Sequence, residues 1–408
     1  MTTAVQPSAA PAKAAPAGAA AAPSAYPFPV GVYESCVNDY DQSKLQTAAA
    51  QQMPLHNISP TGWLRGVWYM FDMAVTGQAT NSVTFSKDNP WSVIQKFVFY
   101  DLGGREVIGP IGGYDLMCIN KFGAYFAVGD PRADATFAAT IGTGATAGSF
   151  SFILWMPLEV VLRDSLGTVQ NESKPGWKTE IWMDSQANTY NQVPSVMGTL
   201  RVRAYVESYT EPESAAPSGR PYSQTPPLPG TLQYWRSENY GLPAGSSNYD
   251  LINGIGFPIR NVLYKLIRTS TGLRSDGDTD WPDPATLTYG NVTLFQRAKA
   301  LWNTRIGRDF GFTGNSGQTM AGLSGTGTTG SVADSPLSHE NGVYPVYNTK
   351  DFSKDPGDEL RYKYTQTMVN TVYRISGNWG GGSNADTLYA LTNWIKPSNS
   401  DYYSLLPQ

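Results

Sequence analysis

The sequence is poor in charge. Only 15% of its 408 residues are Asp, Glu, Lys or Arg, against roughly 25% in an average globular protein. The formal net charge is −4, so no basic field is available to hold phosphate groups, and specific binding of nucleic acid is not expected. A surface with so little charge must stay soluble through neutral polar groups or be covered by other subunits.

Cysteines and long apolar runs are also scarce. The two cysteines, Cys36 and Cys118, lie far apart in the sequence and form neither a disulfide framework nor a zinc-ligand spacing. The best apolar run, Phe150 to Leu162, includes Ser, Pro and Glu and falls short of the roughly 18 residues needed to span a bilayer. The N-terminus lacks the basic head and apolar core of a signal peptide. We therefore expect the protein to be made as a soluble chain.

Histidine, the usual general base near neutral pH, occurs only twice. Neither His56 nor His339 has a partner at metal-ligand spacing, so we expect no catalytic or metal role for either. Residues Gly325 to Gly330 match the GxGxxG pattern. That pattern binds a pyrophosphate only between a strand and a helix, and here it lies in a Gly/Thr-rich stretch that predicts a loop.

Alternating carboxylates at Asp276, Asp278 and Asp280 are the best candidate for a cation site. An EF-hand loop would next need Gly and, six positions later, Glu, but Trp281 and Leu287 stand there. A solvated turn is therefore favoured, and a bound cation stays an open alternative. The sequence thus predicts no catalytic residues, no cofactor-binding residues, no metal ligands and no cofactor; the protein is not expected to be an enzyme.

What the sequence does contain is typical of an all-β protein: 41 Gly, 29 Pro and 12% aromatic residues. The cleanest strand pattern is Leu200 to Tyr209, in which Leu200, Val202, Ala204 and Val206 alternate with polar or larger residues. Other expected strands are 66–75, 91–101, 149–156, 257–269, 367–375 and 388–395.

The expected layout has four parts. Residues 1–60 are an Ala/Pro-rich flexible arm and lead-in, because residues 1–25 hold twelve Ala and four Pro and cannot bury enough side-chain area to offset their ordering entropy. Residues 61–210 form the first β domain, residues 211–231 a Pro-rich linker, and residues 232–408 the second β domain with a C-terminal tail. The two similar sizes suggest an architectural duplication, although no direct sequence repeat is visible.

Two helices are expected. The stronger one spans about 293–309, because Thr293 can cap it and apolar residues recur at spacings of three and four. The apolar stripe of this helix consists of Leu294, Ala298, Leu301, Trp302 and Ile306. A weaker candidate, residues 41–52, needs a partner to pack against.

The order of these segments resembles the major coat protein of tectiviruses, a double-jelly-roll family, over about Trp63 to Trp394. No single motif is diagnostic, and the resemblance rests on many collinear matches. Two features differ: the family commonly has a Gln-rich helical arm, and residues 311–334 are unusually rich in Gly. The matching segments are Ala79–Phe85 (ATNSVTF), Pro90–Asp101 (PWSVIQKFVFYD), Gly113–Phe126 (GYDLMCINKFGAYF), Ser149–Leu166 (SFSFILWMPLEVVLRDSL), Asn261–Arg268 (NVLYKLIR) and Arg305–Phe310 (RIGRDF).

The resemblance implies two eight-stranded jelly rolls in tandem. It implies homotrimers of pseudo-hexagonal outline that tile an icosahedral virus shell over an internal membrane. The partners would be further copies of the chain, vertex and minor capsid proteins and the lipid, and the location the virion capsid, assembled in the host cytoplasm.

One alternative function stays open at the level of sequence. The abundant Trp and Tyr residues could line a sugar groove in a carbohydrate-binding or carbohydrate-cleaving β-sandwich spike protein of a virion. In a sandwich rich in aromatics, these residues more often lie in cores and interfaces. The alternative therefore ranks second.

Overall fold

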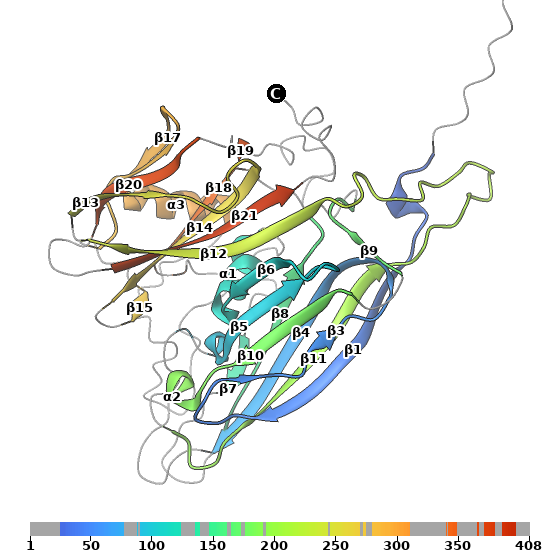
Figure 1. Cartoon of the computed structure of the whole chain (residues 1–408), viewed down its shortest axis with the longest axis horizontal. Coiled ribbons are helices and arrows are strands. Elements are labelled where there is room, and N and C mark those ends of the chain that lie inside the picture. Colours follow the sequence, from blue (N-terminus) through green and yellow to red (C-terminus); the bar gives the residue numbers. More distant parts are fainter. Residues whose placement is uncertain are drawn as a thin grey trace, which may run out of the picture.

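The computed structural model describes most of the chain between residues 25 and 396. The described ranges are 25–76, 88, 90–123, 135–138, 147–160, 165–172, 176–190, 193–243, 245–269, 272–274, 280–310, 340, 342–348, 365–366, 371–379 and 386–396. These residues are mostly strands, arranged in two bodies (Figure 1). Among them, no helix is long and apolar enough to cross a membrane.

The first body is a sandwich of two antiparallel sheets. One sheet has the order β1-β11-β4-β8-β7, with β9 also paired to β4, and the other has the order β6-β5-β10-β2, with β3 also paired to β10. Its elements are η1 (Phe28–Val30), β1 (Glu34–Leu45), β2 (Gln51–Gln52), β3 (His56–Asn57), β4 (Gly62–Thr76), η2 (Trp91–Val93), β5 (Ile94–Tyr100), β6 (Glu106–Ile111), α1 (Gly113–Phe122), β7 (Ala135–Ala138), β8 (Ala147–Pro157), β9 (Val169–Asn171), β10 (Lys178–Met183), α2 (Gln186–Thr189) and β11 (Thr199–Tyr209).

The second body repeats the plan. One sheet contains β12, β21 and β14, with β15, β18 and β19 paired to β14, and the other has the order β13-β20-β16-β17. Its elements are β12 (Leu232–Leu242), β13 (Gly245–Asp250), β14 (Pro258–Arg268), β15 (Leu273–Arg274), β16 (Ala285–Tyr289), β17 (Val292–Arg297), α3 (Lys299–Phe310), β18 (Val343–Tyr347), β19 (Thr365–Gln366), β20 (Tyr373–Trp379) and β21 (Asp386–Lys396).

The two sandwiches have the same topology. Taking β2 and β3 as one position, the main strands of the first sandwich in chain order are β1, β2/β3, β4, β5, β6, β8, β10 and β11. Those of the second are β12, β13, β14, β16, β17, β18, β20 and β21. In both, positions 1-8-3-6 form one sheet and positions 2-7-4-5 the other, and a helix follows position 5. This is the jelly-roll arrangement of eight strands in two sheets, and it confirms the architectural duplication.

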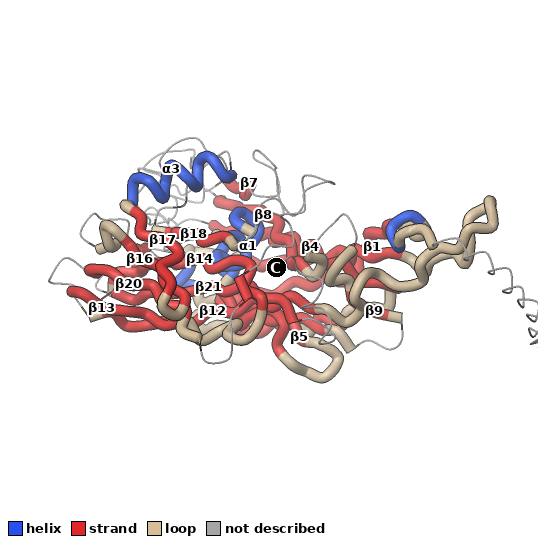
Figure 2. Tube along the Cα trace, turned by 90° about the horizontal axis from the view of Figure 1, so that it is seen from above, coloured by secondary structure: helices blue, strands red, loops and turns tan. Residues whose placement is uncertain are grey.

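The two sandwiches share one sheet. The β6 end of the first sandwich continues into β12 of the second through a parallel pairing of Ile108 with Trp235, so that a single sheet of eleven strands crosses the molecule. Figure 2 shows the strands of both bodies running together in this layer. Because backbone hydrogen bonds cross the boundary, the two bodies are joined by more than a linker.

The alternation of apolar residues predicted for Leu200 to Tyr209 appears in the structure as alternating burial along β11. In β11 the side chains of Leu200, Val202, Ala204 and Val206 are at most 1% exposed and face the sandwich core. Opposite sheets meet through aromatic contacts such as Tyr69 with Phe97, whose ring centroids are 5.3 Å apart and nearly perpendicular. Such edge-to-face pairs add to the apolar area that holds the layers together.

The structure corrects the expected helix at 293–309. Residues Val292–Arg297 are strand β17, and the helix α3 begins at Lys299. Tyr289 pairs with Val292 across the two residues Gly290 and Asn291, with Gly290 at φ +56°. This is a tight hairpin turn, which holds Thr293 and Leu294 in the sheet.

The lead-in to the first sandwich also differs from expectation. Residues 34–45 form β1, which pairs with β11 along its whole length, so the expected helix over 41–52 is wrong. With β2 and β3, this strand makes residues 34–57 part of the sandwich and not of a flexible arm. Residues 1–24 and the tail after residue 396 lie outside the described residues.

Candidate functional site

His56 lies inside the first sandwich, in a chain of hydrogen bonds. Its Nε2 is 2.9 Å from Asp39 Oδ2 and its Nδ1 is 2.9 Å from the Tyr69 hydroxyl, which donates to Thr179 Oγ1 at 2.7 Å. The imidazole is 2% exposed. The ring therefore cross-links β1, β3, β4 and β10 from inside the sandwich.

The other sequence candidates do not assemble into a site. His339, Asp276, Asp278 and residues 325–330 lie outside the described residues. Asp280 is 2% exposed and forms an ion pair with Arg268. Within the described part of the chain, no three His, Cys, Asp or Glu side chains are grouped so that they could hold a metal ion.

The chemistry that the structure does concentrate lies at the junction between the sandwiches. Helix α1 is buried almost all round, and two of its charged residues reach the second sandwich. Lys121 Nζ is 2.5 Å from Glu340 Oε1, and Asp115 Oδ1 is 2.5 Å from Lys265 Nζ on β14. The Tyr114 hydroxyl donates to Glu340 Oε2 at 2.8 Å. These contacts fix α1 of the first sandwich against the second.

Glu340 is the centre of this first network. Its side chain is 2% exposed, and Arg274 Nη1 on β15 lies 3.5 Å from its Oε2. Burial by itself would raise the pKa of Glu340, but the charges of Lys121 and Arg274 outweigh it and lower the pKa to about 2. The carboxylate is therefore ionised in the folded protein.

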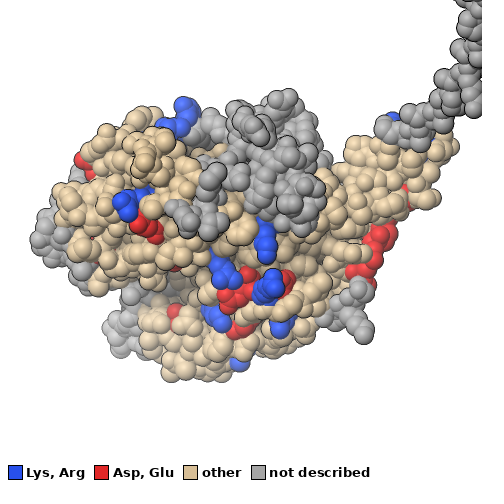
Figure 3. Space-filling model, turned by 45° about the horizontal axis from the view of Figure 1, so that its top comes forward, with Lys and Arg blue, Asp and Glu red and all other residues tan. Residues whose placement is uncertain are grey.

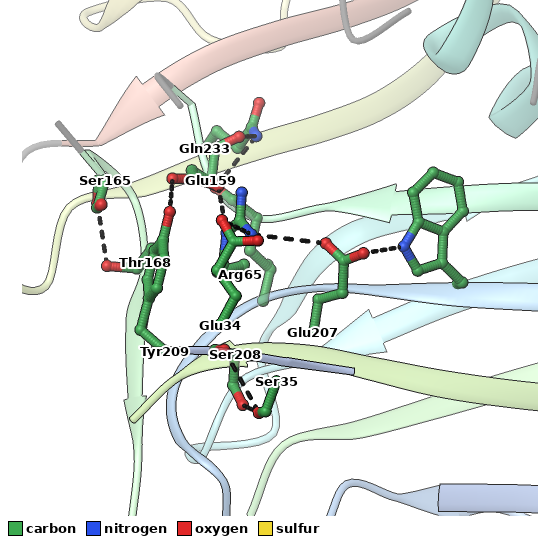
Figure 4. A network of polar contacts seen from close by, with 12 residues as sticks. Glu34, Ser35, Arg65, Glu159, Ser165, Thr168, Glu207, Ser208, Tyr209 and Gln233 are labelled. Carbon is green, nitrogen blue, oxygen red and sulfur yellow. Dashed lines mark hydrogen bonds and ion pairs between the residues drawn. The ribbon is translucent and has the colours of Figure 1, made fainter. Parts of the chain in front are cut away.

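A second network joins the sandwiches at the start of β12 (Figure 4). Gln233 Nε2 donates to the backbone oxygens of Leu158 and Glu159 at 3.1 and 3.0 Å, and Arg260 Nη1 donates to Gln233 Oε1 at 3.1 Å. Arg260 Nη2 also donates to the Gly123 oxygen at 2.8 Å. Gln233 and Arg260 are 0% exposed, so this contact excludes water at the boundary.

Arg65 gathers carboxylates beside that contact. Its guanidinium lies 2.8 Å from Glu159, 2.9 Å from Glu34 and 3.8 Å from Glu207. Burial raises the pKa of Glu159 to about 8 although Arg65 opposes the rise. The network ties β1, β4, β11 and the segment after β8 together where the chain crosses to the second sandwich.

Sequence reasoning missed this junction. The charged groups of α1 meet partners more than 100 residues away, for example Lys121 and Glu340, which are 219 residues apart. No spacing rule links such residues. The only usable signal is that charged residues are rare in this chain, so a Lys inside an apolar stretch such as LMCINKF already suggests a buried partner.

The comparisons with known proteins point to one fold. No family model matches the sequence, and no curated protein matches it. The crystal structure of the STIV MCP matches with a TM-score of 0.56 at 12% identity, covering 92% of this chain and 98% of the other. The atomic structure of Sulfolobus turreted icosahedral virus matches at 0.54 and 10% identity, covering 92% of this chain and 94% of the other.

A third match has the same character. The Faustovirus major capsid protein matches with a TM-score of 0.51 at 9% identity, covering 93% of this chain and 92% of the other. These matches span both sandwiches, and at such low identity they report fold alone. The chain therefore has the double-jelly-roll fold found in major capsid proteins of viruses.

Proposed function

We propose that this chain is the major coat protein of an icosahedral virus and that it works as a shell subunit. The observation that carries the proposal is the pair of sandwiches with one topology, joined by a shared sheet. Three such chains around a threefold axis present six similar wedges, which gives a nearly hexagonal outline. Hexagonal units tile a shell with few kinds of contact.

The surface supports this reading. In Figure 3 the charged side chains of the described residues on the visible face are few and gather mainly near its centre, and much of the remaining described surface is uncharged. Exposed apolar side chains include Val30, Tyr33, Leu102 and Ile252, each at least 57% exposed. Surfaces poor in charge and dotted with apolar groups are suited to burial between subunits.

Finer assignments belong to the same proposal. The partners are further copies of the chain, vertex and minor capsid proteins, and an internal membrane beneath the shell, and the location is the virion capsid assembled in the host cytoplasm. The role is structural, without catalysis. A carbohydrate-binding spike is not favoured, because the similar solved structures are capsid proteins and a whole virus shell.

The test is the mass of the purified full-length protein by sedimentation or light scattering, followed by electron microscopy. We expect particles of three times the chain mass with a pseudo-hexagonal outline. A protein that stays a monomer at every accessible concentration would contradict the proposed function.

A further inference from the structure

One end of the molecule carries a projecting finger, made of residues 25–33 and 210–225. It extends beyond the first sandwich at the right of Figures 1 and 2. Two chain segments hold each other in it: Tyr26 forms a bridge with Tyr222, and the Arg220 guanidinium stacks 3.9 Å from the Tyr26 ring. At its base, Phe28 packs edge-on against Trp63 and Tyr209. The finger is thus a folded feature that reaches outward.

The finger is acidic and apolar. Glu211 and Glu213 are exposed on it, and Val30 and Tyr33 are 57% and 67% exposed. Glu211 lies beside Glu172 at the finger's base, and the pKa of Glu211 is raised to about 7 by burial and by that neighbouring carboxyl. Among the described residues, none of these three glutamates has a Lys or Arg within ion-pair distance. The one cation of the finger, Arg220, lies against the Tyr26 ring.

A pocket of complementary character lies where the shared sheet crosses between the sandwiches. We call it the seam pocket; its volume is 540 Å³. Opposite residues of antiparallel strands share a face, so the register of β12 with β21 places Tyr234 beside Trp394 and Leu232 beside Lys396 on one face. The Tyr234 and Trp394 rings stack with centroids 5.4 Å apart. The lining consists of Tyr100, Gly104, Arg105, Glu106, Tyr234, Arg236, Asn253, Phe257, Trp394 and Lys396.

The pocket carries more positive than negative charge. Arg236 is paired with Glu106 at 3.4 Å, which leaves the exposed Arg105 and Lys396 without an ion pair among the described residues. The pocket therefore offers two exposed cations around an aromatic floor. That combination suits a ligand surface with carboxylates and an aromatic or apolar side chain.

Both loops that flank the pocket are held in place. Asp101 Oδ1 accepts hydrogen bonds from the backbone nitrogens of Gly103 and Arg105, each at 2.8 Å. On the other side, the Glu238 carboxylate accepts from the nitrogens of Ile252 and Asn253 at 3.0 and 3.1 Å. A pocket whose walls are already ordered loses little entropy when it binds.

We propose that the projecting finger of one copy docks into the seam pocket of a second copy. Glu211 and Glu213 face Arg105 and Lys396, and Tyr33 and Val30 pack on the aromatic floor around Tyr234. Because the two surfaces differ, the contact is head-to-tail, and repetition by rotation closes a ring. The inference rests on the proposed shell function and names the surfaces by which copies recognise each other.

The experiment is a charge reversal in the full-length protein. One variant carries Glu211→Lys and Glu213→Lys, a second carries Arg105→Glu and Lys396→Glu, and a third combines all four. Self-association is measured by sedimentation across a concentration series. We expect each two-site variant to raise the midpoint concentration of association at least about tenfold, because like charges then meet, and the combined variant to recover most of that loss.

The matched control reverses an exposed ion pair elsewhere, Asp250→Arg with Arg374→Asp on β13 and β20, and should associate like the wild type. All altered residues except the control pair lie outside strand interiors or at a strand end, and thermal unfolding checks that each variant folds. Wild-type association in both two-site variants, or a combined variant no better than its parents, overturns this inference. A wild type that never associates overturns the shell function instead.

Discussion

The two sandwiches place a helix at the same step of the same topology but use it differently. Helix α1 lies between the bodies, and nine of its ten residues are buried. In helix α3, Trp302 and Ile306 are 1% exposed while Leu301 is 52% exposed. Figure 1 shows α1 beside the second body and α3 away from the first. The two helices share a topological position, so topology does not decide their roles. The place of each sandwich in the chain decides whether its helix packs between the two sandwiches or lies at the surface.

The largest effect should come from breaking the buried charge contact of α1. Lys121 and Arg308 each provide the basic residue in the last turn of their helix. Lys121→Ala leaves Glu340 buried without its nearest counter-charge, and such a loss costs about 3–5 kcal/mol. The free energy of unfolding in denaturant measures it.

Arg308→Ala is the matched control, because Arg308 is exposed. It should change the free energy of unfolding by less than about 0.5 kcal/mol. Equal losses in the two variants would contradict the different roles of the helices.

A second comparison uses one leucine from each helix. Leu116 is 0% exposed and Leu301 is 52% exposed. Leu116→Ala should cost about 2–5 kcal/mol through lost burial and a cavity, whereas Leu301→Ala should be nearly neutral. A large loss at Leu301, measured by the same denaturant titration, would show that α3 is covered in the isolated chain.

The smallest expected effect is on the stability of the fold at acidic pH. Since the pKa of Glu340 is lowered to about 2 from its ordinary 4.5, its contribution to stability is present above pH 4.5 and is lost as the pH falls toward 2. Glu340→Gln should therefore show a flatter fall in stability between pH 4.5 and 2 than the wild type. Denaturant midpoints across that range test the slope, and parallel curves would count against the ionised junction.

The strands were largely predictable from the sequence, and the junction was not. Period-two alternation located β11, whose buried and less buried residues alternate along the strand. The strand-like run 257–269 located β14, which is buried on both faces along most of its length. Helix α1 has no such pattern, since a helix buried on every side shows no polar face. Its partners Lys265 and Glu340 lie in the other sandwich, and only the tertiary fold brings them together.

The predicted helix over residues 41–52 was wrong for a different reason. The segment Asp41–Leu45 has few apolar residues, and its strand exists because β11 offers a hydrogen-bonding edge 160 residues later in the sequence. Local propensity cannot report such a partner. The sequence did contain a signal for the hairpin at Gly290 and Asn291, because Gly-Asn between two strand-like runs is typical of a turn.

The sheet shared by the two sandwiches also has a consequence for how a shell of these chains would curve. Hydrogen bonds tie β12 of the second sandwich to β6 and to the segment after β8 of the first, so the described parts of the two halves are joined directly. A closed shell built from plates joined in this way must bend along the lines where separate molecules meet. The angles between neighbouring molecules would then set the radius of the particle. Chains of identical shape could therefore build shells of more than one size.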